Sequence, residues 1–182
     1  SSEEEIRETV KRLKEIVKKH KKDVDEIAEE LRRIVEELRR RNEEEIKKIR
    51  KILRELEEKR SGDRRKIKEL VDRMKKRLDD HKKTLEEIKR KAKEELEKSK
   101  KRTDEIVEEL RRRLRELEKK GVDEKLVREL ERIVEEIKEE LEKSDRELEK
   151  IIREIAKRLE EIHEETERAV REVKKRLDEV AK

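Results

Sequence analysis

Three histidines, His20, His81 and His163, are the only side chains in this sequence whose ordinary pKa lies near neutral pH. An imidazole can transfer protons, bind a transition metal or respond to pH. The sequence has no cysteine, which excludes disulfides, thiolate metal sites and thiol nucleophiles. It also has no aromatic residue, which excludes base-stacking platforms and aromatic cages. Any chemistry therefore depends on the three histidines and on the side chains beside them.

A metal site would need several further ligands around a histidine. Residues 160–163 contain the Glu-x-x-His spacing that di-iron helical bundles use. Such sites need a second copy of this motif and two more inward carboxylates, but Leu78 precedes His81 and Val17 precedes His20 at the same spacing. We therefore expect no metal and no cofactor.

The catalytic motifs that the sequence resembles are incomplete as well. The His-Glu-x-x-His zinc motif that begins at His163 ends in Glu167 instead of a second histidine. No glycine-rich phosphate loop exists, because Gly62 and Gly121 are the only glycines. Any Ser-His-Asp combination would be buried in a narrow core without a cleft. We predict that the protein is not an enzyme and has no catalytic residues.

The elements that position the histidines follow from the spacing of the apolar residues. These recur at alternating steps of three and four, which indicates amphipathic helices of the coiled-coil type. The two glycines divide the chain into helices over about 2–60, 63–119 and 123–182. Short junctions force neighbouring helices to run antiparallel. We predict an all-α, up-down-up antiparallel three-helix bundle with helices of about 55–60 residues, forming a single domain over 1–182.

Helix-end signals support these boundaries. The junctions at 60–63 and 120–123 each offer a glycine for a left-handed helix end and an aspartate as the next N-cap. The valine of the second junction and Val127 have the spacing of a hydrophobic staple. Ser2 and Glu5 have capping-box spacing at the start of the first helix.

The charge pattern limits the possible partners. Charged residues make up 63% of the chain, and 60 basic and 55 acidic residues are interspersed, which indicates an ion-paired helix surface rather than a nucleic-acid site. No apolar run is long enough for a membrane span or a signal peptide. The apolar stripe suffices for one seam per helix, which favours a monomer that needs no partner. A homo-oligomer is the alternative. We expect a soluble chain without membrane contact at neutral pH, and the sequence does not indicate its compartment.

Short polar residues interrupt the apolar seams. They are His20, Asn42, His81, Ser99, Thr103, Ser144, His163 and Thr166. Antiparallel pairing across short junctions aligns these residues in two cross-sections. One holds Asn42, His81 and His163, with Thr84 and Thr166 about one turn away. The other holds His20, Ser99, Thr103 and Ser144. A buried polar group without a partner costs about 1–3 kcal/mol, so we predict two buried hydrogen-bond networks that set the helix register.

Two interpretations of these networks remain open. They can be satisfied core residues with no further role, or they can make stability depend on pH. Burial as a neutral imidazole lowers the pKa of a histidine below about 6.5, so stability falls as the pH drops below that value. Protonation also replaces a ring acceptor with a donor, and charges on both His81 and His163 would repel. The second interpretation predicts loosening in acid.

These features resemble one class of proteins, the de novo designed helical bundles with buried hydrogen-bond networks. The resemblance covers the whole chain and is carried by the Glu/Lys/Arg surface, the missing Pro, Cys and aromatic residues, the Gly121-Val122-Asp123 loop and the layered polar residues. Members of this class that contain histidine are pH-responsive bundles, some homotrimeric, some monomeric and some made to disturb membranes in acid. The resemblance implies a synthetic structural scaffold. The alternatives are a component of a designed oligomeric or multi-chain helical assembly, or an acid-triggered membrane-active bundle.

Overall fold

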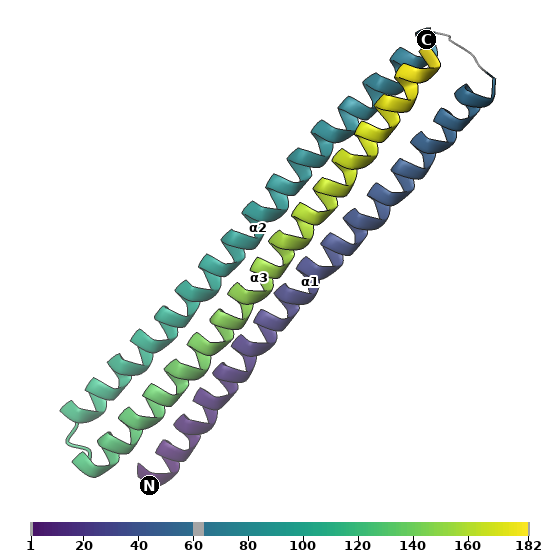
Figure 1. Ribbon diagram of the computed structural model, residues 1–182. Coiled ribbons are helices and arrows are strands. Elements are labelled where there is room, and N and C mark those ends of the chain that lie inside the picture. Colours follow the sequence, from purple (N-terminus) through teal and green to yellow (C-terminus); the bar gives the residue numbers. More distant parts are fainter. Residues whose placement is uncertain (1, 60–63, 182) are drawn as a thin grey trace. The chain divides into compact units, whose positions relative to one another are not determined.

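The computed structural model describes the backbone of residues 2–59, 64–181 and the side chains of residues 4–59, 64–180. Over these residues the chain forms three helices and no strand: α1 (Ser2–Glu58), α2 (Arg64–Lys119) and α3 (Glu124–Ala181). Figure 1 shows that successive helices run in opposite directions. The predicted all-α, antiparallel three-helix fold is confirmed, with helix ends within a few residues of those expected.

The junction between α2 and α3 has the predicted cap chemistry. Gly121 adopts a φ of 76°, the left-handed conformation that a side chain disfavours. The amide of Val122 donates to the carbonyl of Leu117 at 3.3 Å, which is the six-to-one hydrogen bond of a Schellman motif. The side chain of Asp123 accepts from the amide of Lys125 at 3.2 Å and so caps α3. Helix α2 therefore ends, and α3 begins, for reasons that are local to the sequence.

The other predicted helix-end signals were not tested. The junction at 60–63 and the side chain of Ser2 lie outside the described residues. The chemistry of the first junction and the capping box of α1 therefore stay predictions.

The described residues form two compact units. Unit 1 consists of residues 2–30, 92–153, and unit 2 consists of residues 31–59, 64–91, 154–181. Each unit contains one segment of α1, one of α2 and one of α3. The assignment of the chain to a single domain stays a prediction.

Each unit has its own apolar cluster with members from all three helices. The cluster of unit 1 consists of Leu13, Ile106, Val107, Leu110, Val134, Ile137 and Leu141. The cluster of unit 2 consists of Ile49, Leu53, Leu56, Leu70, Met74, Val173 and Leu177. Leu141, Leu53 and Met74 are fully buried. Burial of such side chains is the main favourable contribution to folding, at roughly 1.5–3 kcal/mol each.

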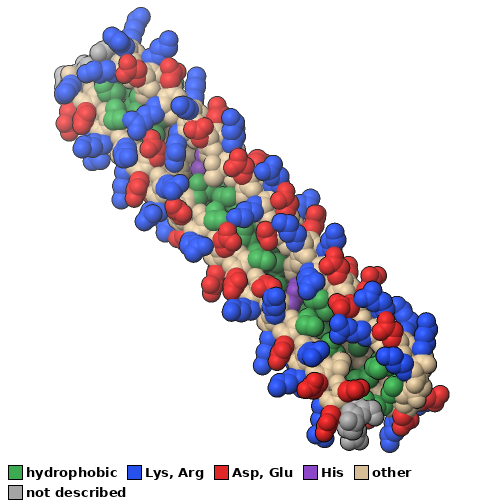
Figure 2. Space-filling view, turned by 180° about the vertical axis from the view of Figure 1, so that it is seen from behind, with side chains coloured by type: hydrophobic (Ala, Val, Ile, Leu, Met, Phe, Trp, Pro, Cys, Tyr) green, Lys and Arg blue, Asp and Glu red, His purple; other side chains and the backbone are tan. Residues whose placement is uncertain are grey.

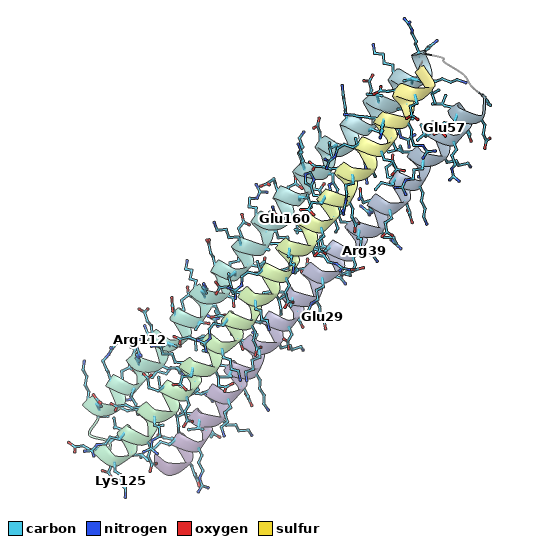
Figure 3. The ribbon with its side chains drawn as sticks, in the orientation of Figure 1. Glu29, Arg39, Glu57, Arg112, Lys125 and Glu160 are labelled. Atoms are coloured by element: carbon cyan, nitrogen blue, oxygen red, sulfur yellow. The ribbon has the colours of Figure 1, made fainter. Side chains whose placement is uncertain are left out.

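The surface carries charges of both signs on the faces seen in Figure 2 and Figure 3, where exposed side chains such as Glu29 and Arg112 point away from the helices. Some of these charges form ion pairs between helices, for example Arg111 with Glu135 at 3.1 Å. Exposed pairs of this kind contribute about 0–1 kcal/mol each, so they do not define the fold. None of the helices, as far as they are described, has an apolar stretch long enough to cross a membrane.

Candidate functional site

A closed group of polar side chains lies in the core of unit 1. This group, called the His20 layer here, consists of His20 from α1, Ser99 and Thr103 from α2, and Asp145 from α3. Each of the four residues is buried, with at most 6% of its surface exposed. His20 has the helical spacing of the seam residues Leu13 and Val24, so it lies on the same face of α1. Ser99 and Thr103 lie one turn apart on the inner face of α2. The periodicity of the helices therefore places all four side chains in the core.

The carboxylate of Asp145 is the centre of the His20 layer. Ser99 Oγ donates to its Oδ1 at 2.5 Å, and Thr103 Oγ1 donates to its Oδ2 at 2.6 Å. His20 Nε2 lies 3.1 Å from Oδ1, 3.2 Å from Thr103 Oγ1 and 3.4 Å from Ser99 Oγ. Both hydroxyls use their protons on the carboxylate, so Nε2 must carry a hydrogen to bond these oxygens. The layer therefore fixes the tautomer of His20.

Hydrogen bonding outweighs burial in its effect on Asp145. Burial by itself raises the pKa of this carboxyl, but the bonds from His20, Ser99 and Thr103 lower it further, so the pKa lies below its ordinary value. Asp145 is thus charged at neutral pH. If His20 takes up a proton, it forms an ion pair with this carboxylate, so the layer contains its own counter-charge.

Asp145 corrects the predicted membership of this layer. The sequence pattern assigned Ser144 to it, and Ser144 is indeed buried. Among the described side chains, however, Ser144 has no hydrogen bond to the layer, whose α3 member is Asp145. The sequence contains a signal that places Asp145 on the seam, because its spacing of four from Leu141 and three to Leu148 is that of the apolar residues. It was missed because an aspartate in a chain with 63% charged residues does not stand out from the surface pattern.

The residue types of the His20 layer are those of a hydrolase triad, but their geometry is not. In a triad, one imidazole nitrogen faces the serine and the other faces the aspartate. Here Ser99 and Asp145 both lie against Nε2 of His20, and the serine donates its proton to the carboxylate. The histidine therefore cannot act as a base that transfers a proton from the serine. This arrangement connects helices and does not activate a nucleophile.

A second polar group lies in unit 2 and is called the His81 layer here. It consists of Asn42 from α1, His81 from α2, and His163 and Thr166 from α3. Asn42 Nδ2 donates to Thr166 Oγ1 at 2.6 Å, and this hydroxyl donates to the carbonyl of Ile162 at 2.8 Å. Both Asn42 and Thr166 are buried. Thr84 is half-buried and donates to the carbonyl of Asp80 in its own helix, so it adds no bond between helices.

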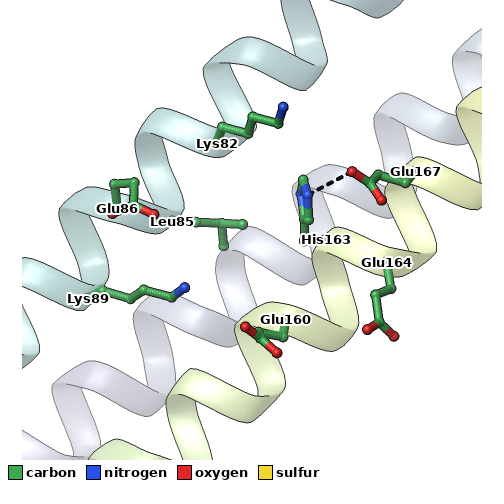
Figure 4. A pocket seen from close by; sticks show the side chains of 8 residues that line it. All are labelled: Lys82, Leu85, Glu86, Lys89, Glu160, His163, Glu164 and Glu167. Carbon is green, nitrogen blue, oxygen red and sulfur yellow. Dashed lines mark ion pairs between the residues drawn. The ribbon is translucent and has the colours of Figure 1, made fainter.

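The two histidines of this layer stack on each other. Their ring centroids are 6.0 Å apart, and the ring planes differ by 12°. His163 is 25% exposed and its Nε2 lies 3.0 Å from Glu167 Oε1. It lines a surface pocket of about 510 Å³ together with residues of α2 and α3, and Figure 4 shows its ion pair with Glu167 there. The structure thus brings His81 and His163 together, as the register argument predicted.

His81 differs from every other member of the two layers in having no hydrogen-bond partner. It is 3% exposed, and neither of its ring nitrogens is bonded to any described protein atom. Asn42 Oδ1, His163 Nδ1 and Arg77 Nε are likewise buried and unbonded. Burial, followed by the positive charges of His163 and Arg77, lowers the pKa of His81 to about 4. The ring is therefore neutral at pH 7.

Metal binding is not supported by these side chains. No group of three or more His, Cys, Asp or Glu within the described part of the chain is arranged to hold a metal ion. Glu160, which has the Glu-x-x-His spacing with His163, points away from the imidazole in Figure 4, as does Glu164.

Comparison with known proteins adds little to this geometry. No protein-family model matches the chain, and no curated protein sequence matches it. A solved structure described as "Computationally designed three helix bundle" is similar, with 22% identity over 98% of this chain and 86% of that chain, and a TM-score of 0.46. A likeness this low carries no inference about function, so the function must be argued from the two polar layers.

Proposed function

We propose that this chain is a designed, non-catalytic structural scaffold. In this proposal its buried polar layers set the register of the helices, and the His81 layer makes the stability of unit 2 fall in acid. The observation that carries the proposal is His81, a buried imidazole without a hydrogen-bond partner that lies beside a second histidine and an arginine.

The role in register is supported by the His20 layer. Asp145 is bonded by side chains from both other helices, so its charge is satisfied in one alignment only. A shift of one residue turns a helical side chain by roughly 100°, which would separate these partners. A buried charge without its partners costs about 3–5 kcal/mol, so misaligned packings of unit 1 are disfavoured by that amount.

The acid response is supported by the pKa of His81. The pKa in the folded state is about 4, below the ordinary 6.5, so between these values the unfolded chain binds more protons than the folded one. The contribution of His81 to stability is therefore complete above pH 6.5 and is lost as the pH falls towards 4. With about 1.4 kcal/mol per pKa unit, the shift from 6.5 to about 4 corresponds to a loss of up to about 3–4 kcal/mol.

A pH titration of helicity and thermal stability tests this function. We expect the melting temperature to fall between pH 7.5 and pH 4.5, with the weakening confined at first to amides of unit 2 in hydrogen exchange. A melting temperature that stays constant over this range would show that the His81 layer serves only to set register.

We further propose that the scaffold works as a monomer, without a nucleic-acid partner and without membrane contact at neutral pH. Every described large apolar side chain is at least partly buried, which supports this. Mass measurement in solution at pH 7 should give the mass of a single chain, 22.5 kDa. A multiple of that mass would favour the alternative of an assembly component.

A further inference from the structure

The charges around His81 differ from those around His20. His81 has Arg77 one turn earlier on α2 and His163 of α3 stacked on its ring. The α1 member of the His81 layer, Asn42, is neutral. Glu167 is paired with Nε2 of His163, which lines a surface pocket (Figure 4). When His81 is protonated, positive groups on α2 and α3 therefore gather in a buried cross-section, and the carboxylate that would correspond to Asp145 is missing.

We propose that the His81 layer binds a small inorganic anion, such as chloride, when His81 carries a positive charge. Four buried nitrogen atoms lack a partner among the described residues: the two of His81, Nδ1 of His163 and Nε of Arg77. Protonated imidazole and guanidinium nitrogens are all donors, and buried donors with uncompensated positive charge are the features of an anion site. The anion would take the role that the carboxylate of Asp145 has in the His20 layer.

A surface pocket lies beside His163, the partly exposed member of this layer. His163 is 25% exposed there, and Lys82 and Lys89 reach over the pocket from α2 in Figure 4. Glutamates from α2 and α3 also line it, namely Glu86, Glu160, Glu164 and Glu167. These carboxylates repel anions, and the ring of His81, which would attract them, gains its charge only in acid because its pKa is lowered to about 4. Binding is therefore restricted to acid.

Anion binding and protonation are then linked. This step rests on the proposed acid response, because an anion that binds only the protonated layer can be detected only if His81 titrates. A ligand that binds one protonation state raises the apparent pKa of His81, by up to about one unit for each tenfold rise in its concentration once the site is saturated. An anion too bulky to enter the layer has no such effect.

The test is an NMR titration of the His81 and His20 ring resonances, with ionic strength held constant by exchanging chloride for gluconate. We expect the titration midpoint of His81 to rise as chloride replaces gluconate. At any given pH the His20 resonances should be the same in the two salts, because the carboxylate of Asp145 already lies against that ring. Equal midpoints of His81 in the two salts would overturn the proposal. So would a midpoint that coincides with unfolding, measured by circular dichroism, in both salts.

A matched variant supplies the anion covalently. Asn42→Asp places a carboxylate in the His81 layer with almost no change in shape. We expect it to raise the midpoint of His81 and to abolish the effect of chloride. A chloride effect as large as in the unmodified chain would overturn the proposal. If this variant does not fold, the titration of the unmodified chain still decides.

The anion site and the proposed function can fail separately. Stability of unit 2 that falls in acid equally in chloride and gluconate overturns the anion site and leaves the acid response intact. Stability that does not change with pH in either salt, with His81 remaining unprotonated, overturns both.

Discussion

In unit 1 the buried histidine faces a carboxylate, whereas in unit 2 the buried histidine faces another histidine. His20 lies 3.1 Å from Asp145, and two hydroxyls complete the bonds of that carboxylate. His81 stacks on His163 with a centroid separation of 6.0 Å and has no bond of its own. Both layers are built from polar residues of all three helices, but only the His20 layer contains a carboxylate that bonds its histidine.

This difference separates the two layers in their response to acid. Asp145 has a lowered pKa, so its contribution to stability is present above the ordinary carboxyl value of 3.8 and is lost only as the pH falls below it. His81 also has a lowered pKa, but as a base it loses its contribution between pH 6.5 and about 4. Asp145 has bonded partners, whereas a charged His81 has only positively charged neighbours. The stability of the chain is therefore sensitive to pH in two separate ranges.

The largest effect should come from removing the carboxylate that distinguishes unit 1. We expect Asp145→Ala to lower the free energy of unfolding by about 3–5 kcal/mol, because His20, Ser99 and Thr103 lose their shared partner. Chemical denaturation at pH 7 measures this. The control is Ser144→Ala at the adjacent buried position, which should cost about 1 kcal/mol or less. Similar losses for the two variants would show that the carboxylate does not organise the layer.

The next largest effect is a difference between the two units in how much amide protection they lose in acid. Between pH 7.5 and pH 4.5 we expect amides in the core of unit 2 to lose about 2–3 kcal/mol of protection, because His81 resists protonation in the folded state. Amides in the core of unit 1 should change less. Site-resolved hydrogen exchange measures both, and equal losses in the two units would contradict the assignment of acid sensitivity to His81.

Replacing each histidine with leucine should give effects of opposite sign. His81→Leu removes a buried ring without partners, so we expect a gain of about 1–2 kcal/mol at pH 7 and a flatter dependence on pH. His20→Leu deprives Asp145 of a bond and should reduce stability by about 1–3 kcal/mol while leaving the acid response. Denaturation at pH 7 and pH 5 measures all four values. Loss of stability in both variants at pH 7 would mean that His81 has partners after all.

The smallest effect concerns the neutral pair of the His81 layer. Thr166→Val keeps the shape of the side chain and removes the acceptor of Asn42 Nδ2, so we expect a loss of about 1–2 kcal/mol. Thr84→Val removes a hydroxyl that is bonded only within its own helix and should have little effect. Thermal unfolding of the two variants compares them. If Thr84→Val were the more damaging, the bond between Asn42 and Thr166 would not be a register contact.

The fold was predictable because its signals are local. The seam spacing gave the three helices, and the glycine and aspartate at 121 and 123 gave the second junction, since left-handed backbone and N-cap preferences act over a few residues. The burial of the polar seam residues was predictable for the same reason. His163 is the exception, being half-buried at the edge of its seam.

The partners of the polar residues were not predictable to the same degree. Antiparallel register correctly placed His81 near His163 and His20 near Thr103, because rise per residue is constant along a helix. It could not distinguish Ser144 from Asp145, since both positions fit the seam. Nor could it show that His81 lacks a hydrogen bond, because this depends on the directions of side chains from three helices.

The sequence by itself thus determined the helices, the second junction and the positions at which polar side chains enter the core. These follow from backbone preferences and from helical periodicity, which are properties of short segments. Only the tertiary structure decided which layer contains a charge and its counter-charge. That outcome depends on distances of about 3 Å between side chains of different helices, and a shift of about 1 Å is enough to make or break such a bond.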